Sequence, residues 1–364
     1  MQNHEPIYDV RTLGAGKTII LGLQHTFAMF GATVLVPILT GLPISTTLLF
    51  AGLGTLLFHL VTKGQVPAFL GSSFAFLGGY AAVAPLLQDG SPNTEMLPYA
   101  CGGVFCAGVV YLILSALIKG FGAKKVMRFF PPVVTGPIII SIGLILAPTA
   151  ISNCATNWPV AIIALVTVIV FNIWGKGMSK IVPILIGIIV SYVAALLMGD
   201  VSFEGFSDET VLGLPPITSM NFDISSRITI MPLALATMME HIGDISAIGA
   251  TTGKNYIAKP GLHRTLLGDG LATCLAAAFG APANTTYGEN TGVLALTKVY
   301  DPRVMQIAAV FAIILSCVPK VAFIIESIPT ATIGGISFIL YGMISAIGIR
   351  NVVENRVDFT RSRN

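Results

Sequence analysis

Charge is scarce in this sequence. Only 10% of the residues are charged, whereas soluble domains carry about 25%. Cysteine is also sparse, and no two cysteines form a C-x-x-C pair or a metal-ligand spacing. The five are Cys101, Cys106, Cys154, Cys274 and Cys317. These scarcities exclude an ordinary soluble domain and give no sign of a metal site or a disulfide framework, so we interpret the cysteines as small core residues.

The sequence also lacks the short motifs of common enzymes. It contains no H-E-x-x-H, no G-x-S-x-G, no Walker loop and no G-x-G-x-x-G, which mark metalloproteases, serine hydrolases, NTPases and dinucleotide enzymes. We therefore expect no enzyme. A membrane-embedded hydrolase that uses Glu240 and His241, and an ion channel, are the weaker alternatives.

Long apolar runs dominate what is present, with 54% hydrophobic residues and a mean hydropathy of +0.84. Because about 20 apolar residues cross a bilayer as a helix, the sequence predicts an all-α polytopic protein in the lipid bilayer with about twelve spans. The predicted spans cover residues 17–39, 45–62, 67–87, 97–118, 126–148, 158–175, 181–199, 228–250, 262–280, 283–299, 304–325 and 329–349. The third and tenth are interrupted by proline and polar residues.

The loop charges set the orientation. Basic residues precede the first predicted span and follow every even-numbered one, whereas residues 200–226 hold five acidic residues and no Lys or Arg. The positive-inside rule then places both ends in the cytoplasm, across the cytoplasmic membrane. The net charge of +3 is too small to suggest a nucleic-acid partner.

Three motifs recur in the same order, about 200–215 residues apart. Gln24-His25 matches Glu240-His241, residues 71–75 match residues 284–288, and Phe130-Pro131-Pro132 matches Ile328-Pro329-Thr330. Seven spans separate the halves, so the repeats are inverted, and inverted repeats with paired broken helices are typical of secondary transporters. Symmetry predicts two more spans beyond residue 349, so we expect the second repeat to be incomplete, with seven spans in the first half and five in the second.

A polar, glycine-bearing stretch, residues 282–292, lies between apolar runs. Irregular backbone at membrane depth is tolerated only where protein buries it or where it lines a cavity, and a carboxylate there costs roughly 2.5–3.5 kcal/mol. We therefore predict that Glu289 belongs to a substrate site and that Gly288 leaves its backbone open to a ligand. Phe74 or Tyr287 would stack on a flat ring, with ordinary packing as the alternative.

A second polar cluster lies in the predicted span 228–250. Glu240 and Asp244 are four residues apart and share a helix face, and His241 is next to Glu240. This pattern predicts substrate binding together with proton coupling, and a buried network that joins helices is the alternative. Gln24 and His25 are interpreted as interhelical contacts, with a role in substrate binding as the alternative. Residues near predicted span ends are interpreted as interface residues: His59, Trp158, Trp174 and Asp269.

The stretch Glu289-Asn290-Thr291-Gly292, followed by four residues and then Thr297-Lys298, resembles the signature of the nucleobase–ascorbate transporter family. That signature is an acidic or amide residue, Asn, one residue, Gly, four residues, Thr and a basic residue. Residues 24–33, 71–76, 260–264 and 284–288 add to the resemblance, which runs from about residue 17 to the end. The sequence looks most like the family's bacterial uracil-transporting members.

The resemblance implies a core domain and a gate domain, with short strands in spans three and ten meeting at the substrate. The core would hold residues 1–124 and 227–326, and the gate residues 125–226 and 327–364. The implied substrate-binding residues are Ser73, Phe74, Glu240, Tyr287, Gly288, Glu289 and Tyr341.

The implied function is import of uracil, or a related nucleobase, by proton symport without a bound cofactor. Glu240, His241 and Asp244 would carry the coupling. Asp244 stands where uracil-transporting members often have His and purine-transporting members often have Asp, whereas Glu289 with Asn290 favours uracil. A xanthine or uric acid permease and a binding-only membrane protein are the alternatives, and a homodimer is left open.

Overall fold

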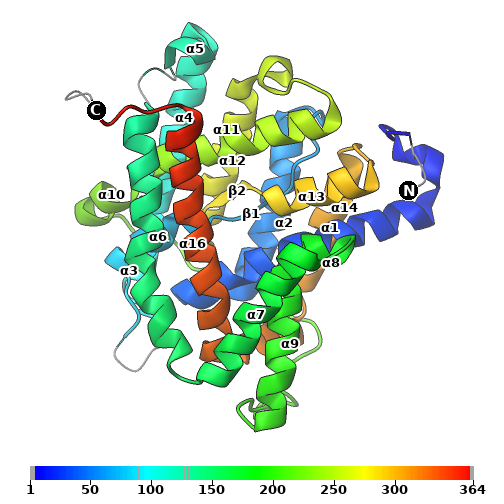
Figure 1. Cartoon of the computed structure of the whole chain (residues 1–364), viewed down its shortest axis with the longest axis vertical. Coiled ribbons are helices and arrows are strands. Elements are labelled where there is room, and N and C mark those ends of the chain that lie inside the picture. Colours follow the sequence, from blue (N-terminus) through cyan, green and yellow to red (C-terminus); the bar gives the residue numbers. More distant parts are fainter. Residues whose placement is uncertain (1–4, 88–90, 127, 129–130, 361–364) are drawn as a thin grey trace.

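The structure is a computed structural model that describes residues 5–87, 91–126, 128 and 131–360. Phe130 of the third repeated motif lies outside these residues. The elements, in chain order (Figure 1), are η1 (Val10–Leu13), α1 (Ala15–Thr40), α2 (Ile44–Val61), β1 (Leu70–Ser72), η2 (Phe74–Phe76), α3 (Leu77–Val83), α4 (Leu97–Phe121), α5 (Ala123–Val126), α6 (Pro132–Cys154), α7 (Trp158–Trp174), α8 (Met178–Ile181), α9 (Pro183–Met198), α10 (Ile224–Ile230), α11 (Leu233–Thr252), the π-helical turn η4 (Ile257–Gly261), α12 (Leu262–Ala278), β2 (Asn284–Thr286), α13 (Gly288–Thr297), α14 (Arg303–Ser316), α15 (Pro319–Glu326) and α16 (Thr330–Glu354).

Five of the described helices are long and apolar enough to cross a membrane alone: α1, α2, α4, α6 and α16. A sixth span results if α14 and α15 are taken together. The predicted count of about twelve is therefore not confirmed by length and composition, because several predicted spans are shorter helices. Among these, α7 has 17 residues and α9 has 16.

The predicted continuous span 304–325 is wrong. It is broken into α14 and α15, which meet at 84°. Pro319 is the first residue of α15 and has no N–H to donate, and the preceding Val318 is extended, with φ −115° and ψ 91°. Proline disfavours a helical conformation in the residue before it, so the helix ends here despite the apolar sequence.

The short strands predicted in residues 67–87 and 283–299 are confirmed. β1 and β2 form one antiparallel pair, in which Leu70 faces Thr286, Gly71 faces Thr285 and Ser72 faces Asn284. Each strand leads directly into a helix, η2–α3 after β1 and α13 after β2. Two broken segments that are far apart in the sequence therefore meet at the centre of the molecule (Figure 1).

The helix packing agrees with an internal repeat, although the structure does not confirm the number of repeated spans. α2 packs against α14, and α4 packs against α12. In a seven-span inverted repeat, α2 and α12 correspond to each other, and so do α4 and α14, so these two contacts are the same contact made twice. α6 and α16 form a further, separate pair.

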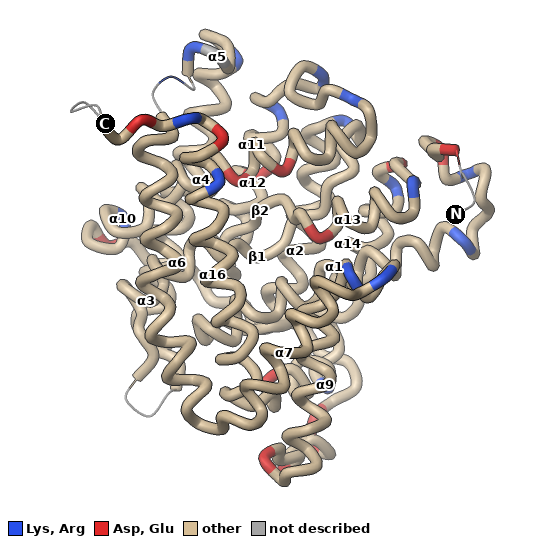
Figure 2. Tube along the Cα trace, viewed as in Figure 1, with Lys and Arg blue, Asp and Glu red and all other residues tan. Residues whose placement is uncertain are grey.

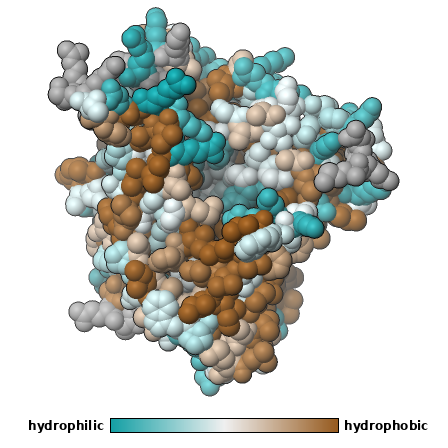
Figure 3. Space-filling view, in the orientation of Figure 1, coloured by the Kyte–Doolittle hydropathy of each residue, from teal (hydrophilic) through white to brown (hydrophobic). Residues whose placement is uncertain are grey.

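The surface is divided by chemistry. Figure 2 shows Lys and Arg gathered mainly along the upper and right parts of the view, whereas the acidic loop after α9 lies at the bottom. Figure 3 shows hydrophobic side chains over α16, α7 and α9 between these regions. Trp174 on α7 is 68% exposed and Leu197 on α9 is 83% exposed. Such a broad apolar surface, bounded by charge, fits a bilayer better than water.

Candidate functional site

The centre of the molecule is organised by the pairing of β1 and β2. The pairing extends by one bond at each end, since the Tyr287 amide donates to the Phe69 carbonyl (3.0 Å) and the Ser73 amide donates to the Ala283 carbonyl (2.8 Å). Thr55 of α2 bonds both the amide and the carbonyl of Leu70, at 2.9 and 3.1 Å. The backbone polar groups of this irregular segment are thus satisfied by protein, as a membrane interior requires.

Tyr287 fills the space beneath β1. Its ring is buried, and its hydroxyl donates to the Ser72 carbonyl at 2.9 Å and accepts a bond from Thr33 Oγ1 at 3.2 Å. A Cβ atom at Gly71 would lie 2.5 Å from the Tyr287 ring. Glycine is therefore required at this position by the close approach of an aromatic ring.

A cavity of about 110 Å³ lies next to the strand pair. Its polar groups come from the broken segments and α11, and its apolar wall comes from α6 and α16. The lining residues are Phe74, Ala75, Ile139, Ile142, Ala236, Glu240, Glu289, Leu340, Met343, Ile344 and Ile347. Three predicted substrate-binding residues, Phe74, Glu240 and Glu289, are therefore brought together. The cavity lies between helices assigned to the predicted core and helices assigned to the predicted gate.

Glu289 also borders a second cavity, of about 170 Å³, on the side of α1 and α9. Neither Glu289 nor Glu240 forms a hydrogen bond or ion pair with another side chain within the described part of the chain. Two such carboxylates beside one cavity have unused acceptor oxygens. They are therefore available to N–H donors of a ligand or to protons.

The first turn of α13 also faces this region. α13 begins at Gly288, so the amides of Gly288 and Glu289 have no partner inside the helix. Gly288 is exposed, and a Cβ atom there would have only Asp244 Oδ1 near it, at 3.6 Å. The helix N-terminus therefore offers N–H donors, with a favourable dipole, to a ligand's oxygen atoms.

Behind the cavity, a buried polar track runs from Asp244 into the protein. Thr286 Oγ1 is 3.3 Å from Asp244 Oδ2 and 3.5 Å from His241 Nδ1. His241 Nδ1 is in turn 3.0 Å from Asp269 Oδ2, and neither side chain is exposed. The carboxyl of Asp244 is thus connected to the His241–Asp269 pair through a single hydroxyl.

The interpretation of Asp269 as an interface residue is wrong. α12 carries it into the interior, where it pairs with His241. His59 is also buried, and its Nε2 lies 2.9 Å from the Ala68 carbonyl. Trp158 and Trp174, in contrast, are exposed. Position near a predicted span end did not distinguish these cases, because span ends were uncertain by several residues.

His25 joins α1 to α13. Asn290 Nδ2 donates to His25 Nδ1 at 3.2 Å and to the His25 carbonyl at 3.1 Å. This is the interhelical contact that the sequence suggested for His25. The same contact fixes the orientation of Asn290, which is next to Glu289. In the sequence, only the family signature pointed to Asn290.

The remaining predicted site residues do not reach the cavity. Ser73 is buried and its amide is used in the strand pairing. Tyr287 lies beneath β1, and Tyr341 is buried beside Leu340 without lining the cavity. His241 is behind the site. The structure thus separates cavity-lining residues from residues that hold the lining in place.

Comparison with known proteins agrees with this arrangement. A profile of the permease family matches residues 16–364. The probable uracil permease of Haemophilus influenzae is 43% identical over 357 residues, which cover 96% of this chain and 84% of that protein. The uracil permease of Bacillus caldolyticus is 43% identical over 378 residues (99% and 85%), and that of Escherichia coli K12 is 39% identical over 359 residues (96% and 82%).

Solved structures share the fold at low sequence identity. The transmembrane domain of the cyanobacterial bicarbonate transporter BicA superposes with a TM-score of 0.69 at 15% identity, covering 96% of this chain and 97% of that one. SLC26A9 gives a TM-score of 0.69 at 13% identity, covering 98% and 61%. The chain therefore belongs to the permease family and is a multi-pass membrane transporter rather than an enzyme.

Proposed function

We propose that this protein imports uracil across the cytoplasmic membrane together with a proton. The observation that carries the proposal is the small cavity that joins Glu240, Glu289 and Phe74 beside the N-terminus of α13. The similarity to proteins named uracil permease supports the choice of uracil as the substrate.

The chemistry of uracil matches the groups around the cavity. Its two ring N–H groups are donors, and Glu240 and Glu289 supply carboxylate acceptors. Its two carbonyl oxygens are acceptors, and the amides at the start of α13 supply donors. The Phe74 ring is available for stacking on the base. Glu240 is the proposed anchor, and Glu289 holds the second edge.

Proton coupling is assigned to the polar groups behind the anchor. Asp244 shares a helix face with Glu240 and contacts Thr286. Carboxyl groups this close repel when both are charged, so a proton at one of them favours binding at the other. We propose that Asp244 carries or tunes this proton, and that the His241–Asp269 pair keeps Thr286 in place.

Transport would require the cavity to open to each side in turn. Its apolar wall is formed by α6 and α16, and its polar wall by α11, η2 and α13. Movement of the predicted core domain relative to the predicted gate domain would separate these walls and release substrate and proton inside. The orientation with both ends in the cytoplasm belongs to the same proposal.

The test is uptake of radiolabelled uracil into proteoliposomes, with and without an inward proton gradient and with unlabelled xanthine as competitor. We expect accumulation that depends on the gradient and resists xanthine. Glu240→Gln should weaken uracil binding about 10- to 100-fold, because a hydrogen bond to a charged acceptor contributes roughly 1.5–3 kcal/mol. Full binding by this variant would remove Glu240 as the anchor.

Asp244→Asn separates coupling from binding. We expect it to bind uracil and to lose gradient-driven accumulation. Asp208→Asn, in the exposed acidic loop, is the matched control and should transport normally. Unchanged accumulation by Asp244→Asn would refute its coupling role, and xanthine competition in the unmodified protein would favour a purine permease.

A further inference from the structure

A second, larger pocket lies away from the proposed substrate cavity and shares no lining residue with it. Its volume is about 810 Å³. Four segments form it: residues 8–11 before α1, residues 63–65 after α2, residues 254–259 after α11 and residues 300–306 around the start of α14. All four lie in the basic loops, which the positive-inside rule places in the cytoplasm. Its size is in the range of small-molecule sites.

The walls of this pocket are held by defined contacts. Ile7 and Val299 form an isolated parallel bridge, in which the Ile7 amide donates to the Lys298 carbonyl at 2.9 Å. Tyr8 and Tyr300 pack edge to face, with ring centroids 5.5 Å apart, and the Tyr8 hydroxyl donates to the Thr252 carbonyl at 2.8 Å. The N-terminal segment is thus tied to both neighbouring segments, so the pocket is a built feature of the fold.

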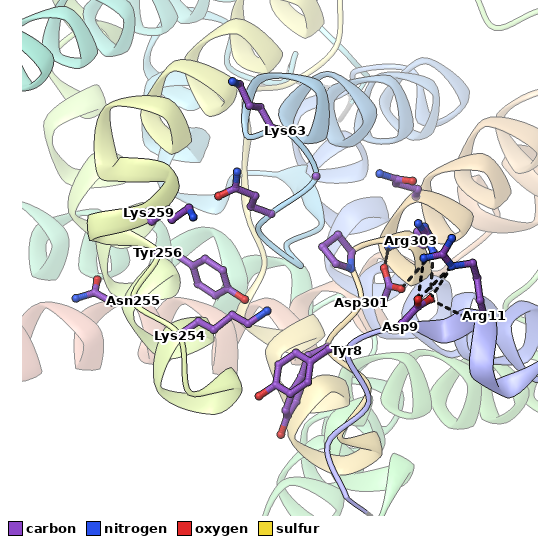
Figure 4. Close-up of a pocket in the computed structure, with 15 residues that line it drawn as sticks. Tyr8, Asp9, Arg11, Lys63, Lys254, Asn255, Tyr256, Lys259, Asp301 and Arg303 are labelled. Atoms are coloured by element: carbon purple, nitrogen blue, oxygen red, sulfur yellow. Dashed lines mark hydrogen bonds and ion pairs between the residues drawn. The ribbon is translucent and has the colours of Figure 1, made fainter.

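The charge in the pocket is unevenly distributed. Five cationic residues and two carboxylates line it, which gives a formal charge of +3. Asp9 already pairs with Arg11 at 2.8 Å and with Arg303 at 3.3 Å. Asp301 accepts the Val10 amide at 2.9 Å and lies 3.8 Å from Arg303. Figure 4 shows these ion pairs together at one wall, with Lys254 and Lys259 at the facing wall and Lys63 above.

The three lysines are left without an acidic partner in the described part of the chain. Lys254 Nζ lies 4.4 Å from the Tyr8 ring centroid, and the side chains of Lys63 and Lys259 form no hydrogen bond or ion pair there. The side-chain amides of Gln65 and Gln306 likewise form no hydrogen bond among the described residues. A concave site with surplus cations and free amide donors concentrates anions, above all those with several oxygen acceptors.

The backbone of Lys63 adds an independent observation. It adopts the left-handed conformation, with φ +58°, and Gly64 follows with φ +59°. Glycine or asparagine fits this conformation better than lysine, which is strained there. Such residues persist only where the surrounding structure holds them, and they cluster at functional sites. The strained position here places an ammonium group on the pocket.

We propose that this pocket binds a phosphate group, carried by a soluble phosphate ester or by an anionic lipid headgroup. Lys63, Lys254 and Lys259 would neutralise it, and Gln65 and Gln306 would donate to its oxygens. The proposal does not depend on which substrate the central cavity transports.

The experiment uses the full chain in nanodiscs and measures binding by calorimetry. In neutral phosphatidylcholine discs, inorganic pyrophosphate and uridine 5′-monophosphate test the soluble source, and uridine, which lacks the phosphate, is their control. Discs that contain phosphatidylglycerol test the lipid source. If the lipid headgroup binds, the protein should melt at a higher temperature than in neutral discs, and pyrophosphate should be displaced. Saturable binding of pyrophosphate supports the site, whether the soluble phosphate ester or the lipid headgroup then binds more tightly.

Lys63→Gly should weaken pyrophosphate binding about tenfold or more without lowering the melting temperature, because glycine suits that backbone conformation. Lys298→Gly is the matched control, since Lys298 has nearly the same φ (+55°) and does not line the pocket. Exposed Lys119→Gln tests non-specific attraction to the basic surface. Absence of pyrophosphate binding, or equal weakening by the control substitutions, would overturn the proposal.

Discussion

At the scale of single residues, the contact between Gly71 and Tyr287 holds the site together. The Tyr287 ring occupies the place where any other residue at position 71 would put its Cβ atom, and the Tyr287 hydroxyl bonds the next residue, Ser72. Tyr287 therefore determines how close β1 and β2 come, although it does not line the cavity. Tyr287 thereby sets the position of Gly288 and Glu289, which follow it directly and belong to the proposed substrate site.

Gly71→Ala should therefore destabilise the protein by about 1–3 kcal/mol, the usual cost of forcing a methyl group into a packed interior, and should weaken substrate binding. The measurement is the melting temperature in detergent, with and without uracil. Gly78→Ala is the control, because a Cβ atom at Gly78 meets no neighbour and alanine is the better helix former. A melting temperature unchanged by Gly71→Ala would mean that the ring moves aside easily.

The residues that line the cavity were predictable from sequence to a useful degree. Glu240, Glu289 and Phe74 were found because a carboxylate or a polar break inside an apolar run is costly and needs a reason. The buried position of Asp269 was not found, because its partner, His241, is brought to it only by the packing of α11 and α12. The burial of Tyr341 away from the cavity could not be predicted for the same reason. The spacing of apolar residues along a helix shows which face is buried, but not which element packs against that face.

At the scale of elements, the N-terminal segment is fastened to the loop before α14 by backbone and by charge. The Val10 amide donates to Asp301, and Asp9 pairs with Arg11 and Arg303. Donation from the Arg11 side chain and amide lowers the pKa of Asp9 from 3.8 to about 2. Since the folded pKa is depressed, the stabilisation is present above pH 3.8 and is lost as the pH falls through about 2.

The segment should accordingly stay docked between pH 8 and pH 5, the range over which the proposed proton coupling would be tested. A spin label at exposed Thr12, in a background with Cys106 and Cys317 replaced by serine, should show the same mobility at both pH values. Asp9→Asn should raise the mobility at both, and high salt should do so in the unmodified protein, because exposed ion pairs are screened. Mobility that rises between pH 8 and pH 5 without substitution would contradict this account.

Elements were predicted well where composition alone decides them and poorly where the chain bends. The polar breaks in residues 67–87 and 283–299 were visible in the sequence, but the two short strands were implied only by the family resemblance. The predicted span 126–148 began too early, because α6 starts at Pro132. The division of residues 304–325 was missed, although Pro319 was visible, because an apolar window does not show whether a proline kinks a helix or begins another.

At the scale of the whole molecule, charge and hydropathy predict an orientation. Lys and Arg gather at one side, and the acidic loop after α9 lies at the other (Figure 2), with an apolar surface between them (Figure 3). The positive-inside rule assigns the first side to the cytoplasm. The number of spans was less predictable, because the short helices α7 and α9 and the bent α14–α15 pair satisfy no simple length rule.

The orientation is testable by labelling whole cells with a membrane-impermeant maleimide. Asp208→Cys, in the acidic loop, should react, and Lys119→Cys, at the end of α4, should react only after the cells are opened. Both positions are exposed, so a difference in reactivity reports the side of the membrane. The reverse pattern would invert the assignment and place the lysine-lined pocket outside.

The three-residue pairing of β1 with β2 has a consequence for how this protein can be altered. Side chains alternate along a strand, so one inserted or deleted residue turns every following side chain to the opposite face. An insertion after Gly71 would shift the start of η2 against that of α13, and the cavity would lose either Phe74 or Glu289. Engineering of substrate preference should therefore exchange side chains in these two segments and conserve their lengths, whereas the exposed residues 207–212 of the acidic loop can tolerate insertions.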